Sequence, residues 1–310
     1  MLRPPTKYII RLTIGLILII LLFFFVSPIA VIQSLQSINP LFLVCAVLVY
    51  AFTFLILTLR WRIIVAHMGG YIPLIEAYQA FAGGVLYSDF TPGRIGDLTR
   101  AVLIKERIGI QMGVISVMID RYIDIIVLTG LGVTALVILS SRFVSFFPIF
   151  AISILIAIFI GVTILFSSKF WIILPLIQKI PVPSIKEAAE HLREGLSGFR
   201  NGKIVIAKGV LLTILAWVTH ALRVFLITMG LGYTLPIPDL FLILPLISTL
   251  SLIPITISGL GLVEGGLMTA IGKYGIPLSA ALSIAVIDRG LTVLFHFVVG
   301  GRYAVKNILQ

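Results

Sequence analysis

The residues most able to do chemistry in this chain are charged side chains within long apolar segments. Two clusters of them occur, in segments 112–140 and 277–301: Asp120, Arg121 and Asp124 in the first, and Asp288 and Arg289 in the second. An ionised group at the centre of a membrane costs about 2.5–3.5 kcal/mol on insertion scales. These charges must therefore be paired or hydrated. Either they are buried ion pairs that hold helices together, or they form a site for a substrate or a proton.

The two clusters have a common depth. At 1.5 Å per residue, Asp120 lies about 12 Å into its segment and Asp288 about 16 Å into its own, near the middle of an apolar core of about 30 Å. We therefore expect Arg121 and Arg289 to meet in one site near the midplane. Their expected partners are Asp124, which Arg121 reaches at i+3, Asp288, or the carboxylates Asp97 and Glu264.

A glycine-rich break precedes each cluster. The first reads Thr91-Pro92-Gly93-Arg94-Ile95-Gly96-Asp97-Leu98-Thr99-Arg100. A helix that starts after Gly93 presents free N–H groups to anions, and Arg94 and Arg100 add forked donors that match phosphate. The alternative is that both arginines only anchor the base of a hairpin on the cytoplasmic side.

The second break contains Gly259 and Gly261 and is followed by Glu264, which corresponds to Asp97. A carboxylate in an apolar hairpin is a candidate proton carrier, or else a helix cap. His220 and Arg223 share one face of the segment 205–231 and are candidates for lining the same cavity. His67 and His296 we interpret as structural.

The segments that carry these residues are typical of a membrane. Of 310 residues, 60% are hydrophobic and 11% charged, against about 25% charged in soluble domains, and the mean hydropathy is +1.19. We predict an all-α polytopic membrane protein with a single domain, 1–310. About six spans are expected, at 8–32, 39–64, 112–140, 144–167, 205–231 and 277–301. An additional short pair of spans within 144–180 stays an alternative.

Two further apolar segments, 73–92 and 239–272, are interrupted by proline and glycine, which favours re-entrant hairpins. The polar segment 184–203 is predicted to form an amphipathic cytoplasmic helix. Each half of the chain, about 1–140 and 141–310, follows the same order of break, carboxylate, Gly-Ile turn and Asp-Arg pair. The two halves would cross the membrane in opposite directions, as inverted repeats of transporters do.

The net charge of +11 is explained by topology. With the N-terminus inside, 18 of the 23 basic residues, Arg60 and Arg100 among them, fall on the inner side, and only Arg142 and Lys273 fall outside. This predicts a plasma-membrane protein with both termini cytoplasmic. The single cysteine, Cys45, and four scattered histidines offer no disulfide within the chain and no metal site. We expect no cofactor, no nucleic-acid partner and no enzymatic activity, and self-association into a homo-oligomer stays open.

Several of these residues resemble one known family. They are Arg60-Trp61-Arg62, the stretch from Thr91 to Ala101, Asp120-Arg121-x-x-Asp124, Pro254, Gly259-Leu260-Gly261-x-x-Glu264 and Asp288-Arg289. The pattern, over about residues 40–305, resembles the flippase-like membrane family related to the lysylphosphatidylglycerol synthase transmembrane region, which includes the flippase half of multiple peptide resistance factors. The family more often has Glu where this chain has Asp120. We expect no soluble aminoacyl-transfer domain in this protein, so the resemblance does not imply synthase activity.

The resemblance and the charged residues together predict a lipid flippase or lipid-headgroup transporter. Its expected partner is a membrane lipid that bears phosphate, either anionic, aminoacylated or linked to a sugar. Arg94, Arg100, Arg121 and Arg289 would hold the headgroup, with Gly93, Gly259 and Gly261 at the breaks. Asp97, Asp120, Asp124, Glu264 and Asp288 would balance charge or carry protons. The alternatives are a transporter of small solutes or ions on the same scaffold, and an accessory membrane subunit for processing lipid-linked sugars.

The charge distribution makes the topology testable. In a variant without Cys45, single cysteines placed near residues 190 and 305 should resist a membrane-impermeant thiol reagent in intact cells, because both positions are predicted to be cytoplasmic. They should react once the membrane is permeabilised. Labelling of either position from outside intact cells would refute the predicted orientation.

Overall fold

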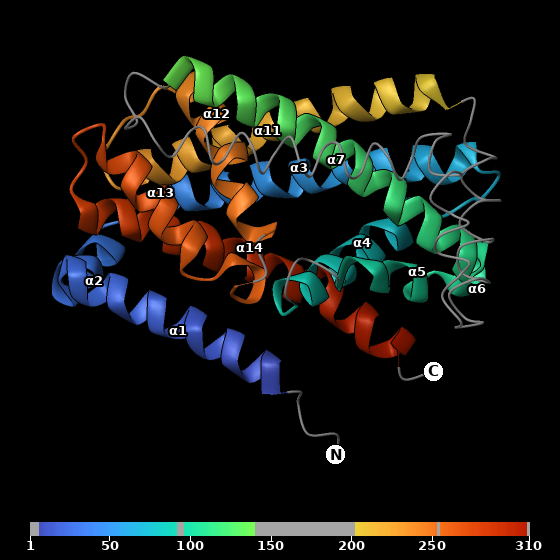
Figure 1. The fold of residues 1–310 in the computed structure, drawn as a ribbon, viewed down its shortest axis with the longest axis horizontal. Coiled ribbons are helices and arrows are strands. Elements are labelled where there is room, and N and C mark those ends of the chain that lie inside the picture. Colours follow the sequence, from blue (N-terminus) through green and yellow to red (C-terminus); the bar gives the residue numbers. More distant parts are fainter. Residues whose placement is uncertain (1–5, 92–95, 140–201, 253–254, 309–310) are drawn as a thin grey trace, which may run out of the picture.

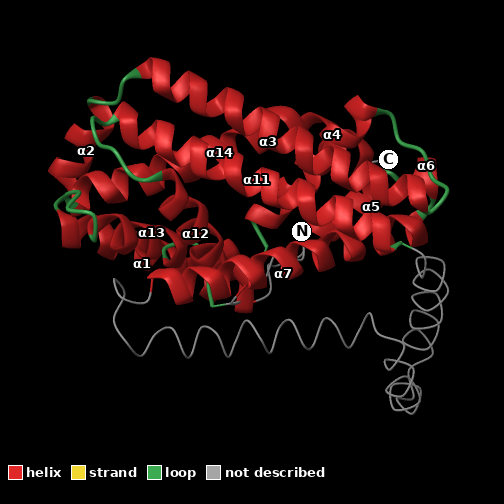
Figure 2. Cartoon of the chain, turned by 90° about the horizontal axis from the view of Figure 1, so that it is seen from above, coloured by secondary structure: helices red, strands yellow, loops and turns green. Residues whose placement is uncertain are grey.

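The computed structural model describes residues 6–91, 96–139, 202–252 and 255–308. In these ranges the chain forms helices and loops and no strand (Figure 2), which confirms the predicted all-helical fold. The elements follow one another as α1 (Thr6–Val26), α2 (Pro28–Gln36), α3 (Pro40–His67), α4 (Leu74–Asp89), α5 (Thr99–Leu103), α6 (Lys105–Ile108), α7 (Ile110–Leu139), α11 (Lys203–Gly230), α12 (Ile237–Ser248), η2 (Thr249–Leu252), η3 (Ile257–Gly259), α13 (Leu262–Gly272) and α14 (Leu278–Ile308).

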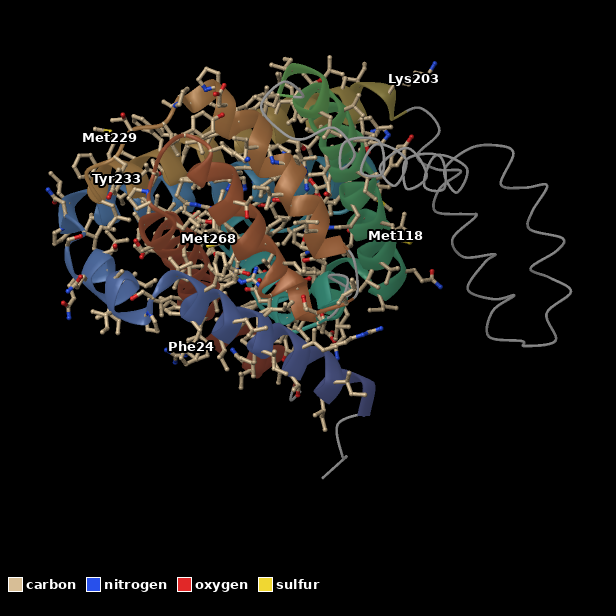
Figure 3. All side chains as sticks on the ribbon, turned by 60° about the vertical axis from the view of Figure 1, so that its left-hand side comes forward. Phe24, Met118, Lys203, Met229, Tyr233 and Met268 are labelled. Carbon is tan, nitrogen blue, oxygen red and sulfur yellow. The ribbon has the colours of Figure 1, made fainter. Side chains whose placement is uncertain are left out.

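Five described helices are long and apolar enough to cross a membrane: α1, α3, α7, α11 and α14. Their outer faces expose large apolar side chains, such as Phe24 (71% exposed), Leu211 (67%) and Phe297 (65%). Figure 3 shows the contrast between Phe24, at the outer edge of α1, and Met268, which lies among the helices. Such a surface suits contact with lipid rather than water. The chain is therefore a multi-pass membrane protein. Three predictions concern residues outside the described ranges: the span 144–167, the alternative pair within 144–180 and the polar segment up to residue 201.

The first predicted span is corrected at its end. We expected an uninterrupted segment over 8–32, but α1 ends at Val26 and α2 begins at Pro28. Ser27, between them, has a positive φ of 76°. Proline suits the first position of a helix and disfavours helical backbone in the residue before it. Pro28 therefore ends the first helix and starts a second one.

The long helices α3 and α11 pack antiparallel to each other. Thr53 on α3 donates a hydrogen bond to Thr219 on α11 over 2.8 Å, and Arg60, further along α3, donates to Thr213, which is earlier on α11. The broken segments pack against long helices that are distant in the sequence, since α4 contacts α14 and α12 contacts α7. In Figure 1, α7 runs away from the end of the molecule that holds α6, whereas α14 runs toward that end.

The segments with internal breaks form short helices, as predicted. At 1.5 Å per residue, the 16 residues of α4 span about 24 Å, less than an apolar core of about 30 Å, and α12 and α13 are shorter. Between α12 and α13, Gly259 and Gly261 have φ values of 71° and 82°, which glycine adopts at little cost. This confirms the predicted break at Gly261. Gly93 lies outside the described residues, and the re-entrant path of both segments stays a prediction.

The contact between α4 and α14 depends on one glycine, and this generates a prediction. A Cβ added at Gly300 would lie 2.3 Å from the backbone N of Gly83, whereas a Cβ at Gly290 on the same helix would meet nothing within 4 Å. Gly300→Ala should lower the free energy of unfolding by about 1–3 kcal/mol, because the two backbones would have to separate. Thermal unfolding in detergent, with Gly290→Ala as the matched control, measures this. Equal unfolding temperatures for the two variants would contradict the packing described here.

Candidate functional site

A cavity of about 550 Å³ lies among the helices of both halves. Its volume is within the range of about 300–1,000 Å³ that small-molecule sites have. Arg121 of α7 and Arg289 of α14 both line it, so the two arginines that we expected to meet lie on the wall of one cavity. The other charged or histidine residues on the wall are Arg60, Asp89, Asp97, Asp124, His220, Arg223, Glu264, Asp288 and His296.

Arg60 holds the aspartates of α7 in place. Asp120 and Asp124 are four residues apart and so share one face of the helix. From α3, Arg60 Nε donates to Asp120 Oδ1 over 2.8 Å, and its Nη1 donates to Asp124 and, over 2.6 Å, to Thr213 on α11. The side chain of Arg60 is 1% exposed. This corrects the sequence analysis, which counted Arg60 among the cytoplasmic charges.

Arg100 lies behind the cavity rather than on its wall. Both its terminal nitrogens donate to Asp120 Oδ2 over 3.0 Å, and both side chains are fully buried. Gly84 makes room for it, since a Cβ at that position would lie 2.1 Å from Cγ of Arg100. We expected Arg100 to hold a phosphate and Asp120 to balance charge or carry a proton at the site. In the structure Asp120 balances the charge of Arg100 together with that of Arg60, and neither Arg100 nor Asp120 lines the cavity.

Arg121 lines the cavity and is paired most closely with two carboxylates, while a third, Asp120, lies 3.7 Å from its Nη2. Its Nη1 lies 3.1 Å from Asp97 Oδ2 and 3.1 Å from Asp124 Oδ2, which is the predicted i,i+3 contact. Its side chain is 28% exposed. Asp97 comes just after the first break, so this pair ties the break to the middle of α7.

A similar set of ion pairs joins α11, α13 and α14. Arg223 of α11 donates to both carboxylate oxygens of Asp288 on α14, over 2.7 and 3.0 Å. Arg289 Nε lies 3.3 Å from Glu264 Oε1, and its Nη2 donates to the carbonyl of Ser258 over 3.1 Å. The other oxygen of Glu264 accepts from the backbone N of Gly261 over 2.6 Å. Glu264 therefore caps α13 and also pairs with an arginine, and the pair ties the second break to α14.

Besides Arg60, the wall carries one pair of residues that was not predicted as part of a site, Asp89 and His296. His296 of α14, which we interpreted as structural, lies on the cavity wall. Its Nδ1 is 2.7 Å from Asp89 Oδ2 at the end of α4, and its Nε2 is 2.6 Å from the hydroxyl of Tyr50 on α3. Nothing in the spacing of Asp89 and His296, which are 207 residues apart, marks them as partners.

The remaining predicted residues have three outcomes. His220 and Arg223 line the cavity as expected. Gly259 and Gly261 shape the turn before α13 and are not among the lining residues. Gly93 and Arg94 fall in 92–95, outside the described residues.

Some polar atoms at the cavity have no hydrogen-bond partner in the described part of the chain. They include two donors, Arg223 Nη1 and Arg121 Nε, and one acceptor, Asp97 Oδ1. All three are buried, where an unsatisfied polar group costs about 1–3 kcal/mol. These atoms are covered in the structure, so a ligand that accepts hydrogen bonds from the arginines and donates one to the aspartate would remove this cost once the side chains around them move.

Removal of Arg60 should be costly. In Arg60→Ala, Asp120 keeps Arg100 but Asp124 loses one of its two arginines, and breaking a buried ion pair costs about 3–5 kcal/mol, less what protonation recovers. We expect a large fall in unfolding temperature in detergent, compared with Arg302→Ala at an exposed position on α14. Equal unfolding temperatures for these two variants would show that the Arg60 pairs contribute little to stability.

Comparison with known proteins places the chain in a family. The family model described as lysylphosphatidylglycerol synthase TM region matches residues 8–300. A UPF0104 membrane protein of Methanothermobacter thermautotrophicus is 21% identical over 91% of this chain and 90% of its own length. Another, of Methanocaldococcus jannaschii, is 21% identical over 95% of this chain and 93% of its own length. The chain therefore belongs to the family of the lysylphosphatidylglycerol synthase TM region.

Proposed function

We propose that this protein is a flippase or headgroup transporter for phosphate-bearing lipids, located in the plasma membrane with both termini cytoplasmic, and that it is not an enzyme. The observation that carries the proposal is the charged cavity within an apolar helix bundle, with Arg121 and Arg289 on the same wall. Charged groups inside a membrane bundle are expensive and usually mark the path of a polar substrate.

The free hydrogen-bonding atoms support a lipid headgroup as the ligand. The unpartnered donors of Arg121 and Arg223 suit the oxygens of a phosphate, and the unpartnered oxygen of Asp97 suits a hydroxyl or amine of the same headgroup. The large apolar residues on the outer faces of the helices suit acyl chains that remain in the bilayer.

The reciprocal ion pairs support an inverted repeat as the basis of transport. Arg60 of α3 pairs with α7 and contacts Thr213, ten residues before Arg223 on α11. In turn, Arg223 pairs with α14, and its guanidinium lies 4.6 Å from the ring centroid of Tyr50, ten residues before Arg60. Two halves of this kind can exchange equivalent positions around one site, which is how inverted repeats give alternating access. A ligand drives that exchange only if the two states bind it with different affinity.

The proposal predicts lipid movement that depends on the arginine forks. In vesicles that contain the protein, acyl-labelled fluorescent phosphatidylglycerol or polyprenyl phosphate should leave the inner leaflet and become accessible to dithionite. Arg121→Lys and Arg289→Lys keep the charge, and therefore the ion pairs, but lose the fork. Each should fold and move lipid about 10- to 100-fold more slowly, because a hydrogen bond to a charged group contributes about 1.5–3 kcal/mol.

Arg302→Lys, at an exposed position on α14, is the matched control and should move lipid at the wild-type rate. Uptake of radiolabelled inorganic phosphate by the same vesicles separates lipid transport from the small-solute alternative. If neither labelled lipid moves in wild-type vesicles, the flippase proposal is wrong. Phosphate uptake without lipid movement would favour the alternative.

A further inference from the structure

The cavity wall carries more acidic than basic side chains. Among the described residues it has four arginines, Arg60, Arg121, Arg223 and Arg289, and five carboxylates, Asp89, Asp97, Asp124, Glu264 and Asp288. Arg100 and Asp120, buried behind the wall, add one charge of each sign. With its histidines neutral, the described part of the site thus has one excess negative charge. An anionic headgroup that enters would raise this excess from one negative charge to two in a medium that screens charge poorly, and one added proton would bring it back to one.

The ion pairs of the wall differ in their capacity to take that proton. Asp97, Asp124, Asp288 and Glu264 each have an arginine partner. Arginine stays protonated at all physiological pH values, so a proton on any of these carboxylates would break an ion pair. Among the described ion pairs of the wall, Asp89–His296 alone contains no arginine. Imidazole is the side chain that gains and loses a proton between pH 5 and 8.

The groups around His296 come from several helices. Asp89 of α4 faces Nδ1, and the Tyr50 hydroxyl of α3 faces Nε2. From α11, His220 lies 6.1 Å from the ring of Tyr50, between centroids, and Arg223 covers that ring while pairing with Asp288. The charges of the other helices packed on α14, Glu264 of α13 and Arg100 of α5, are already paired with Arg289 and Asp120. In the neutral imidazole that donates to Asp89, Nε2 accepts from Tyr50.

A proton on Nε2 therefore reverses the hydrogen bond to Tyr50 and converts the contact with Asp89 into an ion pair between full charges. Asp89 is the last residue of α4, directly before the first break. The protonation state of His296 therefore acts on the joint between this broken segment and α14, and through Tyr50 on the ring beneath Arg223. The Asp89–His296 pair thus lies where the two halves of the molecule meet.

We propose that a proton is the co-substrate of this protein, bound at the Asp89–His296 pair and carried in the same direction as an anionic headgroup, one proton for each negative charge. This inference rests on the proposed lipid transport. It makes the transported unit electrically neutral, since the imidazolium balances the headgroup anion within the cavity. The step is a simple protonation of imidazole Nε2, and the proton leaves when the headgroup does.

The wild-type protein tests this directly. Vesicles of phosphatidylcholine trap the pH dye pyranine, and acyl-labelled phosphatidylglycerol is added to the outer leaflet only. Inward movement of the lipid should acidify the interior in proportion. Its rate should be unchanged by a membrane potential set with potassium and valinomycin, and should fall as the pH is raised, because fewer imidazole side chains then carry the proton.

Variants locate the proton. His296→Gln and Asp89→Asn keep polar side chains of similar size but cannot form the charged pair. Lipid movement in them should lose this pH dependence and the coupled acidification. His67→Gln, an exposed position at the end of α3, is the control and should behave as wild type.

The outcomes separate the two proposals. Lipid movement without acidification, or movement that a membrane potential accelerates, would overturn proton coupling and leave the flippase proposal intact. Acidification that persists in His296→Gln would place the proton elsewhere and overturn the assignment to this pair. Absence of lipid movement in wild-type vesicles at every pH would overturn both proposals.

Discussion

Every ionised group inside this bundle needs a partner of opposite charge, and this requirement determines which helices meet. Arg60 joins α3 to α7, Arg223 joins α11 to α14, and Arg121 and Arg289 join those long helices to the residues that follow the two breaks. In an apolar medium a missing partner costs several kcal/mol. Apolar contacts give less discrimination, because lipid and protein interior are similarly apolar and small residues such as Gly83 and Gly300 only let the helices approach. Stability and site are thus built from the same side chains.

The same pairs leave the site ready to respond to a ligand. Each arginine on the wall is neutralised by a carboxylate. Arg121 and Arg223 each also have one nitrogen without a hydrogen-bond acceptor in the part of the chain that the structure describes. A headgroup can therefore bind without an ion pair having to separate first. Two contacts have no counterpart in the other set of ion pairs among the described residues. Arg100 and Asp120 form a fully buried pair, and Asp89 and His296 add a titratable contact between α4 and α14.

Much of this architecture is predictable from the sequence because apolar length and glycine position report directly on helices and their ends. The long helices α3, α7, α11 and α14 match the predicted segments closely, and the break at Gly261 follows from a backbone that only glycine adopts easily. The partners of the charges were harder to predict. Arg60 was missed because we assigned cations to the two sides of the membrane without asking whether the carboxylates within the bundle had enough arginine partners. The predicted carboxylates of the bundle outnumber its predicted arginines by two: five (Asp97, Asp120, Asp124, Glu264 and Asp288) against three (Arg121, Arg223 and Arg289). In the structure, Arg60 and Arg100 are the two missing partners. Asp89 and His296 meet only through the packing of α4 on α14, which no local pattern encodes.

An experimental structure of the protein in a bilayer disc that contains phosphatidylglycerol would test directly whether the cavity binds a lipid headgroup. We expect headgroup density inside the cavity, with the phosphate in contact with Arg121 and with Arg289 or Arg223, and acyl chains that pass between helices into the bilayer. A cavity sealed from the bilayer, with lipid density confined to the outer faces of the helices, would contradict this expectation. The ion pairs would then serve only to hold the bundle together.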